Sequence, residues 1–340
     1  MPTVLDSLNS ALRRALDASP DVFLLGEDIL DPYGGVFKVT RGLSSAYPDR
    51  VLTTPVSEAG ITGLAAGMAL RGLRPVVEIM FGDFTTLIAD QLINHIAKFA
   101  YMYNEQVKTP LVIRTPMGGR RGYGPTHSQT LEKLYLGVPG LQILAPTNLD
   151  DPGQLLYDAI LVSDDPVLFI ENKLIYSLPI DDANRLAEFE VKTTHLSYNG
   201  LLTPTYTLTV HDAPAPGLTI CSYGYMSELA RQAVLRRAYE HELFCELLIF
   251  TRLAPFEINP ILESLQCTRR LLTVEEGTYT LGWGAEILAR CVEMTGTGLQ
   301  FAARVAADDE PIPASPVLEA KVLPEVEDIV QKSLKLTHKG

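Results

Sequence analysis

The sequence has few of the features that mark secreted or membrane proteins. Its 340 residues include four cysteines, and none of them form a Cys-x-x-Cys spacing. We therefore expect buried, reduced thiols rather than a disulfide framework or a zinc site. No run approaches the roughly 20 apolar residues that span a bilayer, and residues 1–6 lack the parts of a secretory signal. These absences predict a cytoplasmic protein that does not associate with membranes.

Positive charge is also scarce. Lysine and arginine number 28 against 41 aspartates and glutamates, which gives a formal net charge of −13. A nucleic-acid surface needs a basic face, so nucleic acid is not an expected partner. The nucleophile elbow, the Walker loop, the dinucleotide fingerprint and the zincin motif are all missing. Their absence counts against hydrolases, phosphate-loop enzymes and zinc peptidases.

What the sequence does contain is an alternation of short apolar runs and helical patterns. Strand-like runs lie at 22–25, 75–80, 110–114, 141–144 and 167–170, and helical patterns lie at about 6–18, 58–71, 85–103 and 150–162. Nearly continuous apolar strands separated by helices predict an α/β fold, with a parallel sheet covered on both faces. Within the 85–103 pattern, Ile88, Leu92, Ile96 and Tyr103 share the predicted buried side, whereas His95 falls on the solvated side.

A second α/β unit follows, with strands predicted near 218–222, 243–250, 271–275 and 299–305. Between the two units, residues 188–192 and 205–210 have the pattern of paired strands, and the run Asp212–Gly217 is rich in proline and alanine. We therefore predict three parts: a first domain at 1–180, a linker with a β-hairpin at 181–216, and a second domain at 217–340.

The segment Thr54–Gly63 places a carboxylate where a strand gives way to a helix. Ser57 has the character of an N-cap, and the helix that follows ends near Gly72. Small residues along this helix would let a flat ligand approach closely, and the helix dipole favours an ionised Glu58. Glu58 can therefore hold a ligand nitrogen, or it can simply be a favourable dipole contact, and this segment alone leaves both readings open.

Three unusual loops follow other strands of the same predicted sheet: Gly26–Asp28, Met80–Phe84 and Met117–Gln129. Ligands of open α/β sheets bind outside the carboxyl ends of the strands, which places Glu27, Phe84 and His127 at one edge. The third loop has four glycines within seven positions, which lets it wrap closely around a ligand. His127 belongs either to a site or to the internal bracing of this loop.

Several segments together resemble one known family. They are Phe23–Asp28, Lys38–Leu43, Thr54–Gly60, Asp90–Asn94, His127–Gln129, Pro139–Leu141, Glu171–Asn172, Arg252–Pro255, Val274–Gly277 and Asp309–Pro313. The set resembles the beta subunit of the thiamine-diphosphate-dependent 2-oxoacid dehydrogenases, the decarboxylating component of the pyruvate and branched-chain complexes.

This resemblance implies a transketolase-like fold, in which a pyrimidine-binding domain precedes the transketolase C-terminal domain. It also implies roles for four residues. Glu58 matches the glutamate that holds the aminopyrimidine ring of thiamine diphosphate, and Phe84 matches the aromatic residue that packs on that ring. Glu27 matches an acid that lines the pocket, and His127 matches the histidine near the reacting thiazolium carbon.

The family's Gly-Asp-Gly motif for diphosphate and magnesium does not occur in the sequence. The resemblance therefore implies that this chain holds only the pyrimidine half of the cofactor and no metal. A separate alpha subunit is expected to hold the diphosphate and Mg²⁺ in an α2β2 heterotetramer. A small 2-oxoacid is the expected substrate, and a lipoyl-bearing acyltransferase core is the expected partner.

Three functions stay open at this point. The first is decarboxylation of a 2-oxoacid with transfer of the acyl group to lipoamide. The second is a thiamine-diphosphate-dependent carboligase that acts without a lipoyl core, and the third is a non-catalytic scaffold subunit. Two features depart from the family pattern. Arg120 and Arg121 either bind an anionic group of the substrate or are solvated or paired with the alpha chain, and residues 196–216 have no predicted role.

Overall fold

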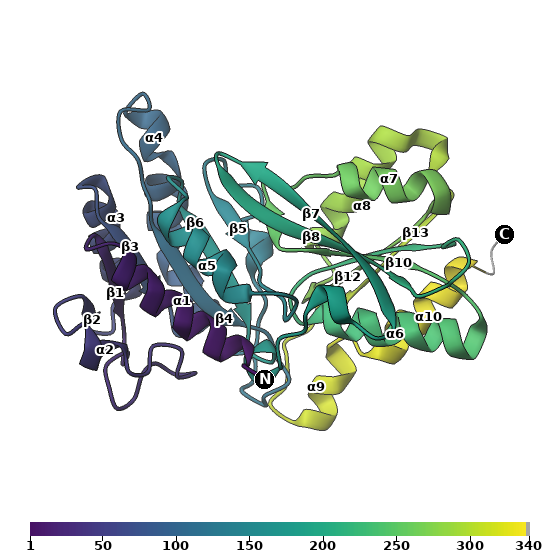
Figure 1. Cartoon of the computed structure of the whole chain (residues 1–340), viewed down its shortest axis with the longest axis horizontal. Helices are drawn as coiled ribbons and strands as arrows, with labels where there is room; N and C mark the ends of the chain where they lie inside the picture. Colours follow the sequence, from purple (N-terminus) through teal and green to yellow (C-terminus); the bar gives the residue numbers. More distant parts are fainter. Residues whose placement is uncertain (338–340) are drawn as a thin grey trace.

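The computed structural model describes residues 1–337 and folds them into two α/β units that lie side by side (Figure 1). Each unit is built on one sheet with helices on both faces. Within residues 1–337 no helix combines the length and apolar character needed to cross a bilayer. The predicted α/β class and the predicted parallel sheets are confirmed.

The first sheet has seven strands in the order β11-β5-β6-β4-β3-β1-β2. Their bounds are β1 (Val22–Gly26), β2 (Val51–Thr53), β3 (Arg74–Glu78), β4 (Val112–Met117), β5 (Gln142–Leu144), β6 (Val167–Asn172) and β11 (Arg252–Ala254). The six strands of the first unit pair in parallel, and only β11, from the second half of the chain, pairs antiparallel, with β5. The carboxyl ends of the parallel strands therefore meet at one edge.

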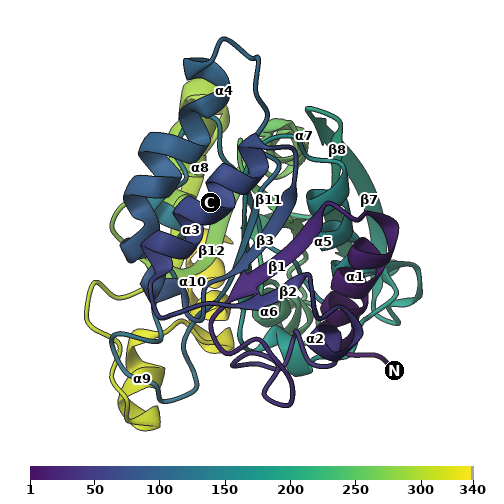
Figure 2. The same ribbon diagram turned by 90° about the vertical axis from the view of Figure 1, so that its left-hand side faces the viewer.

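Helices cover both faces of this sheet (Figure 2). On one face lie α1 (Val4–Ala18) and α5 (Pro152–Leu161), on the other lies α3 (Glu58–Leu70), and α2 (Leu43–Ala46) precedes β2. Helix α1 begins with a capping box between Thr3 and Asp6 and buries Val4, Leu8 and Leu12 at helical spacing. Each face thus has its own apolar layer, one built on α1 and α5 and the other on α3.

The helix predicted at 85–103 is irregular. It consists of the 3-10 helix η1 (Gly82–Ile88), the π-helix η2 (Gln91–His95), the 3-10 turn η3 (Ile96–Lys98) and the short helix α4 (Phe99–Met102). Ile88, Leu92 and Ile96 are buried, as predicted, and His95 is half-exposed beside Asp90. The prediction for Tyr103 is wrong, because this end of the segment projects past the sheet (Figure 1) and Tyr103 is 49% exposed.

The second sheet has the order β13-β12-β9-β10-β8-β7. Its strands are β7 (Phe189–Tyr198), β8 (Leu201–Val210), β9 (Thr219–Ser222), β10 (Glu246–Phe250), β12 (Arg270–Thr278) and β13 (Phe301–Ala307). Its helices are α6 (Met226–His241), α7 (Asn259–Thr268), α8 (Trp283–Thr295), α9 (Pro316–Val322) and α10 (Val326–Thr337). Short 3-10 turns complete the chain: η4 (Glu132–Leu134), η5 (Ile175–Ser177), η6 (Ala183–Arg185) and η7 (Gly296–Gly298).

The hairpin expected in the linker forms from β7 and β8, with a tight turn at Asn199–Gly200. Strand β8 also pairs with β10, so the hairpin extends the second sheet and accounts for most of residues 196–216. The division at residues 180 and 216 itself stays a prediction.

One apolar cluster includes residues of α3 and of α7 and α8, so the two units share a packed interface. All four cysteines are free, but Cys267 is exposed, contrary to the prediction of buried thiols.

Candidate active site

Two glutamates come together where β1 and β2 end. Glu27 follows β1 directly, and Glu58 opens α3 after β2, while the N–H of Thr54 donates to the carbonyl of Gly26 at 3.1 Å. Ser57 occupies the N-cap position of α3, although its side chain forms no capping hydrogen bond. Both carboxylates are buried, with Glu27 4% and Glu58 9% exposed. Parallel pairing of β1 with β2 is what brings these two acids to the same place.

The electrostatics of this acid pair are unfavourable in the chain by itself. Burial raises the pKa of Glu27, the neighbouring charge of Glu58 raises it further, and a hydrogen bond from the backbone of Ser57 acts in the opposite direction. Within residues 1–337 neither carboxylate forms a salt bridge, since the ion pairs there involve other residues. Such a pair of acids suits a ligand that presents nitrogen donors.

Several buried polar atoms around the pair have no hydrogen-bond partner in the described part of the chain. They are Oε1 of Glu27, Oγ1 of Thr54, Oγ1 of Thr62 and Oε1 of Gln91. Thr62 lies one turn after Glu58 on α3, and α3 packs against both η1 and η2. Buried polar groups in native proteins are nearly always satisfied, so these atoms fit a bound ring with a polar edge. The aminopyrimidine ring of thiamine diphosphate has such an edge.

Phe84 and His127 come together in an aromatic cluster with Phe81. The His127 ring lies 4.7 Å from Phe81 and 5.3 Å from Phe84, measured between ring centroids, and the two phenylalanines are 5.7 Å apart. The hydroxyl of Thr126 lies 3.0 Å from Nδ1 of His127. Since β1 lies between β2 and β3, this cluster and the acid pair occupy the same edge of the sheet. The structure thus gathers all four predicted residues along this edge, in two groups.

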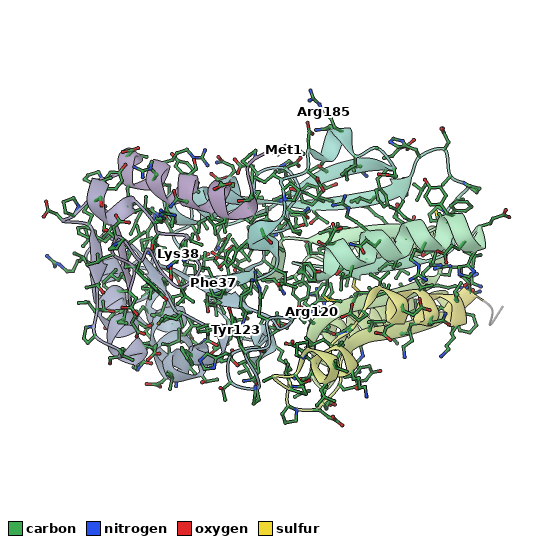
Figure 3. All side chains as sticks on the ribbon, turned by 90° about the horizontal axis from the view of Figure 1, so that it is seen from below. Met1, Phe37, Lys38, Arg120, Tyr123 and Arg185 are labelled. Atoms are coloured by element: carbon green, nitrogen blue, oxygen red, sulfur yellow. The ribbon has the colours of Figure 1, made fainter. Side chains whose placement is uncertain are left out.

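Arg120 of the glycine-rich loop binds residues of the second unit of the same chain. Nη1 of Arg120 donates to Glu276 at 2.7 Å, its backbone N–H donates to Glu319 at 2.7 Å, and its guanidinium lies 5.6 Å from the Tyr225 ring. Figure 3 shows Arg120 where the two units meet. The interpretation of Arg120 as a substrate anchor therefore loses support. Arg121 is exposed and donates to the carbonyl of Lys173 at 3.3 Å.

A buried ion-pair network next to the site was not predicted. Arg114 on β4 donates to Glu171 on β6, through Nε at 2.9 Å and through Nη2, and to Glu78 on β3. The hydroxyl of Tyr176 donates to Glu171 at 2.5 Å, and its ring lies 5.5 Å from Phe37. Phe37 in turn contacts Phe81 at 5.8 Å. Charged residues inside otherwise apolar strands were the available signal for this network.

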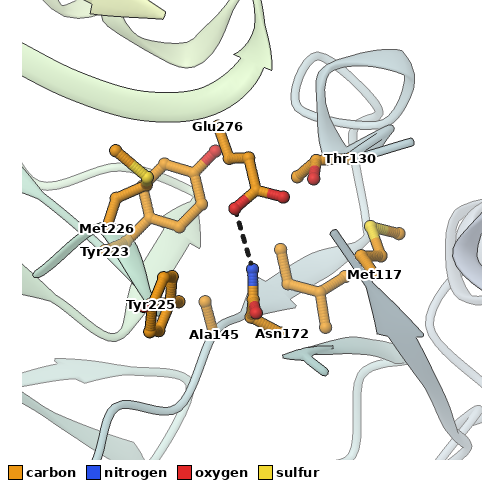
Figure 4. Close-up of a pocket in the computed structure, with 10 residues that line it drawn as sticks. Met117, Thr130, Ala145, Asn172, Tyr223, Tyr225, Met226 and Glu276 are labelled. Carbon is orange, nitrogen blue, oxygen red and sulfur yellow. Dashed lines mark hydrogen bonds between the residues drawn. The ribbon is translucent and has the colours of Figure 1, made fainter. Parts of the chain in front are cut away.

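A small cavity lies between the two units, lined by Met117, Thr130, Asn172, Tyr223 and Glu276 among others (Figure 4). Glu276 accepts hydrogen bonds there from Nδ2 of Asn172 at 3.2 Å and from the N–H of Gly119 at 2.6 Å. The cavity has room for about one water molecule. It is therefore a feature of the interface between the units and not a substrate pocket.

Comparison with known families defines the class of protein to which this fold and site belong. The family described as transketolase, pyrimidine binding domain, matches residues 1–179, and the family described as transketolase, C-terminal domain, matches residues 208–329. Among solved structures, a split gene transketolase described as an inactive beta4 tetramer superimposes with a TM-score of 0.71. It covers 99% of both chains, and at 19% identity it shows the fold alone. The chain is thus a protein with the paired domains of transketolase.

Sequence relatives narrow this class. The mitochondrial pyruvate dehydrogenase E1 component subunit beta-1 of Arabidopsis thaliana is 36% identical, and the match covers 99% of this chain and 90% of the relative. The corresponding beta subunits of Drosophila melanogaster and Homo sapiens are 36% and 34% identical, over 98% and 96% of this chain and 88% of each relative. The chain belongs to the family of pyruvate dehydrogenase E1 component beta subunits, which confirms the resemblance found in the sequence.

The same relatives correct one expectation. A cytoplasmic location was predicted from the sequence, but the relatives from A. thaliana, D. melanogaster and H. sapiens are all named as mitochondrial proteins. The comparison therefore contradicts the cytoplasmic prediction.

Proposed function

We propose that this chain is the beta subunit of a heteromeric thiamine-diphosphate enzyme that decarboxylates a 2-oxoacid and passes the acyl group to lipoamide. Membership of the E1 beta family supports this function, and the names of the relatives point to pyruvate as the 2-oxoacid. The observation that carries it is the buried pair of Glu27 and Glu58, which forms no ion pair within residues 1–337. The carboligase and scaffold alternatives gain no support from these relatives.

Four residues of this chain act in the proposed site. Thiamine diphosphate supplies, when bound, a carbanion on its thiazolium carbon. Glu58 holds the ring nitrogen of the pyrimidine with its carboxylate, and Glu27 lines the same pocket. Phe84 packs on the ring and, with Phe81, excludes water, which strengthens electrostatic interactions inside the site. His127 moves a proton near the reacting carbon, and imidazole suits this role because its ring nitrogens can accept and donate a proton.

A separate alpha subunit completes this site in the proposed assembly. It holds the diphosphate and Mg²⁺, for which this sequence has no Gly-Asp-Gly motif, and the complex is an α2β2 heterotetramer. Exposed apolar residues support a covered face beside the site: Val56 is 83%, Leu64 57% and Leu87 54% exposed. Large apolar side chains gathered at a surface commonly mark an interface. A lipoyl acyltransferase core accepts the acyl group.

The function is tested by changing Glu58 to Gln in the complex co-expressed with its alpha subunit. The amide keeps the shape of the side chain but removes the charge that holds the ring nitrogen. We expect 2-oxoacid decarboxylation at saturating cofactor to fall about 10²- to 10⁴-fold, the usual worth of a positioned proton transfer. Co-purification of the alpha subunit should be unchanged.

Glu286→Gln is the matched control. Glu286 also lies in the first turn of a helix, α8, but it is exposed and belongs to the second unit. This variant should retain full activity. Normal decarboxylation by Glu58→Gln would contradict the proposed site and would revive the scaffold alternative.

A further inference from the structure

Lys173 is a fully buried lysine beside the aromatic cluster, and the proposed site does not yet use it. It follows the last residue of β6, and its backbone N–H donates to the carbonyl of Met117 at 3.0 Å. Its side chain is 0% exposed. A buried ammonium is costly unless it is paired, because it loses its hydration. The contacts that compensate this buried ammonium therefore need to be identified.

The ammonium of Lys173 makes specific contacts with the His127 region. Nζ donates a hydrogen bond to the backbone carbonyl of His127. It also lies 5.1 Å from the centroid of the Phe81 ring and 5.5 Å from that of Tyr123, within the range of cation–π attraction. Within residues 1–337, Lys173 forms no carboxylate ion pair closer than 4 Å. The His127 backbone and two aromatic faces thus take the place of a carboxylate partner.

The loop that carries His127 needs such an anchor. Gly118, Gly122 and Gly124 all have positive φ angles, and glycines move easily between backbone conformations. The backbone hydrogen bond of His127 itself, to the carbonyl of Gly124, is long at 3.3 Å. Gln129 ties the end of this loop to Asp83, with Nε2 donating at 2.8 Å, and the Lys173 contact adds a hydrogen bond at the backbone of His127 itself.

We propose that Lys173 is a positioning residue, which anchors the backbone of His127 and holds its imidazole against Phe81 and Phe84. The inference rests on the role proposed above for His127. Catalytic groups must be held close to their productive geometry, and a displacement of about 1 Å can cost up to about 100-fold in rate. Lys173 thus acts through His127 and needs no contact with the substrate.

The charge of Lys173 gives this anchor a pH dependence. Burial lowers the pKa of Lys173 to about 8, the carboxylates of Asp83 and Glu276 oppose this shift, Arg121 adds to it, and Glu319 opposes it weakly. Below pH 8 the ammonium is charged and binds the carbonyl and the rings most strongly. As the pH rises through about 8 it loses its proton, and the anchor weakens.

The test compares Lys173→Met and Lys173→Arg in the complex with the alpha subunit. We expect Lys173→Met to lower kcat about 10- to 100-fold and to change KM for the 2-oxoacid much less, because His127 is misplaced while binding is kept. Lys173→Arg keeps a charge at every accessible pH. We expect kcat of the wild-type complex to fall above about pH 8, and we expect Lys173→Arg to restore part of the activity and to remove this fall.

Lys133→Met is the matched control. Lys133 is partly buried, whereas Lys173 is fully buried, and the Lys133 ammonium donates to the carbonyl of Thr280 in the second unit at 2.7 Å instead of to the backbone of His127. An unchanged kcat and pH profile in Lys173→Met would overturn the inference, as would an equal loss in Lys133→Met. If Lys173→Met fails to assemble, the pH profile of kcat in Lys173→Arg is the test. A fall of kcat above about pH 8 in Lys173→Arg that equals the fall in the wild type would overturn the inference.

A double-mutant cycle separates this inference from the proposed function. If Lys173 acts through His127, adding Lys173→Met to His127→Ala should lower kcat no further, because residues that act as a unit are not additive. Additive losses would overturn the positioning role and leave the function standing. Full activity of His127→Ala alone would instead refute the role proposed for His127.

Discussion

Two sets of buried acids lie along the first sheet, and they differ in their partners. Glu78 on β3 and Glu171 on β6 flank Arg114 on β4, whose guanidinium binds both. Glu27 and Glu58, which follow the adjacent strands β1 and β2, share no cation within residues 1–337. Both sets are almost completely buried. The two sets are therefore alike in burial and differ in whether they have an internal counter-charge.

The two sets also differ in what their charges contribute to the stability of the free chain. In the Arg114 network one guanidinium binds two carboxylates, and burial raises the pKa of Glu78, so the network holds Tyr176, Phe37 and the aromatic cluster without any ligand. The acid pair has no cation within residues 1–337, which costs stability in the free chain, and in the proposed site the same carboxylates bind the cofactor. Binding sites commonly lower the stability of a protein, because binding needs like charges and unpaired polar groups to be held close together.

The largest effect is expected where a cation is removed from the paired set. Arg114→Met leaves two buried carboxylates without a cation, and within residues 1–337 only Glu171 keeps a hydrogen bond, from Tyr176. Breaking a buried ion pair in this way typically costs about 3–5 kcal/mol. We expect a large fall in the denaturation midpoint of the complex, or a loss of soluble protein. Arg14→Met is the control: Arg14 lies 3.9 Å from Asp151 at a half-exposed position, where a pair is worth about 1 kcal/mol or less. Equal, small effects of both changes would contradict the structural role of the network.

A smaller effect of opposite sign is expected in the unpaired set. Glu27→Gln removes a buried charge that has no cation, so the complex without thiamine diphosphate should become more stable, by on the order of 1 kcal/mol. At the same time the affinity for thiamine diphosphate should fall, since Glu27 lines the proposed pocket. Thermal melting with and without the cofactor measures both. A variant that is destabilised and binds the cofactor normally would show that Glu27 is a structural acid like Glu171.

Much of the fold could be predicted from the sequence, because local pattern determines it. The apolar runs at 22–25 and 167–170 became strands, and the runs of small and apolar residues after Glu58 became α3. What could not be predicted depends on contacts between distant segments. Strand β11 leaves the second unit to join the first sheet, and nothing in Arg252–Ala254 itself indicates this partner. The π-helix η2 at Gln91–His95 could not be predicted either, because its apolar pattern is that of an ordinary helix.

The candidate site could be predicted only in part from the sequence, for the same reason. Glu27, Glu58, Phe84 and His127 each follow a strand, so strand order alone predicts that they share an edge. For Arg120 the sequence left open an anchor for the substrate and a solvated or alpha-paired side chain, and it missed the partner Glu276 because that residue lies 156 positions away in the second unit. Lys173 was missed because a lysine after a strand has no special pattern until the loop that carries His127 folds over it. Local sequence pattern does not predict partners, such as the Glu276 carboxylate or the Lys173 ammonium, that come from distant segments.

The smallest predicted effect is a difference in how stability depends on pH. The folded-state pKa of Glu27 is raised above its unfolded value, so the folded chain keeps this proton over a range in which the unfolded chain has lost it. The contribution of Glu27 to stability is therefore present in acid and is lost as the pH rises through the raised pKa. The stability of Glu27→Gln minus that of the wild type should grow over this range and then level off, when thermal melting of the cofactor-free complex is measured from pH 5 upwards. Glu275 offers a comparison in the second unit, because burial raises its pKa to about 8 and Glu275→Gln should extend the rise to that pH. A difference that is flat with pH for Glu27→Gln would mean that a cation, supplied by the alpha subunit, already neutralises the pair.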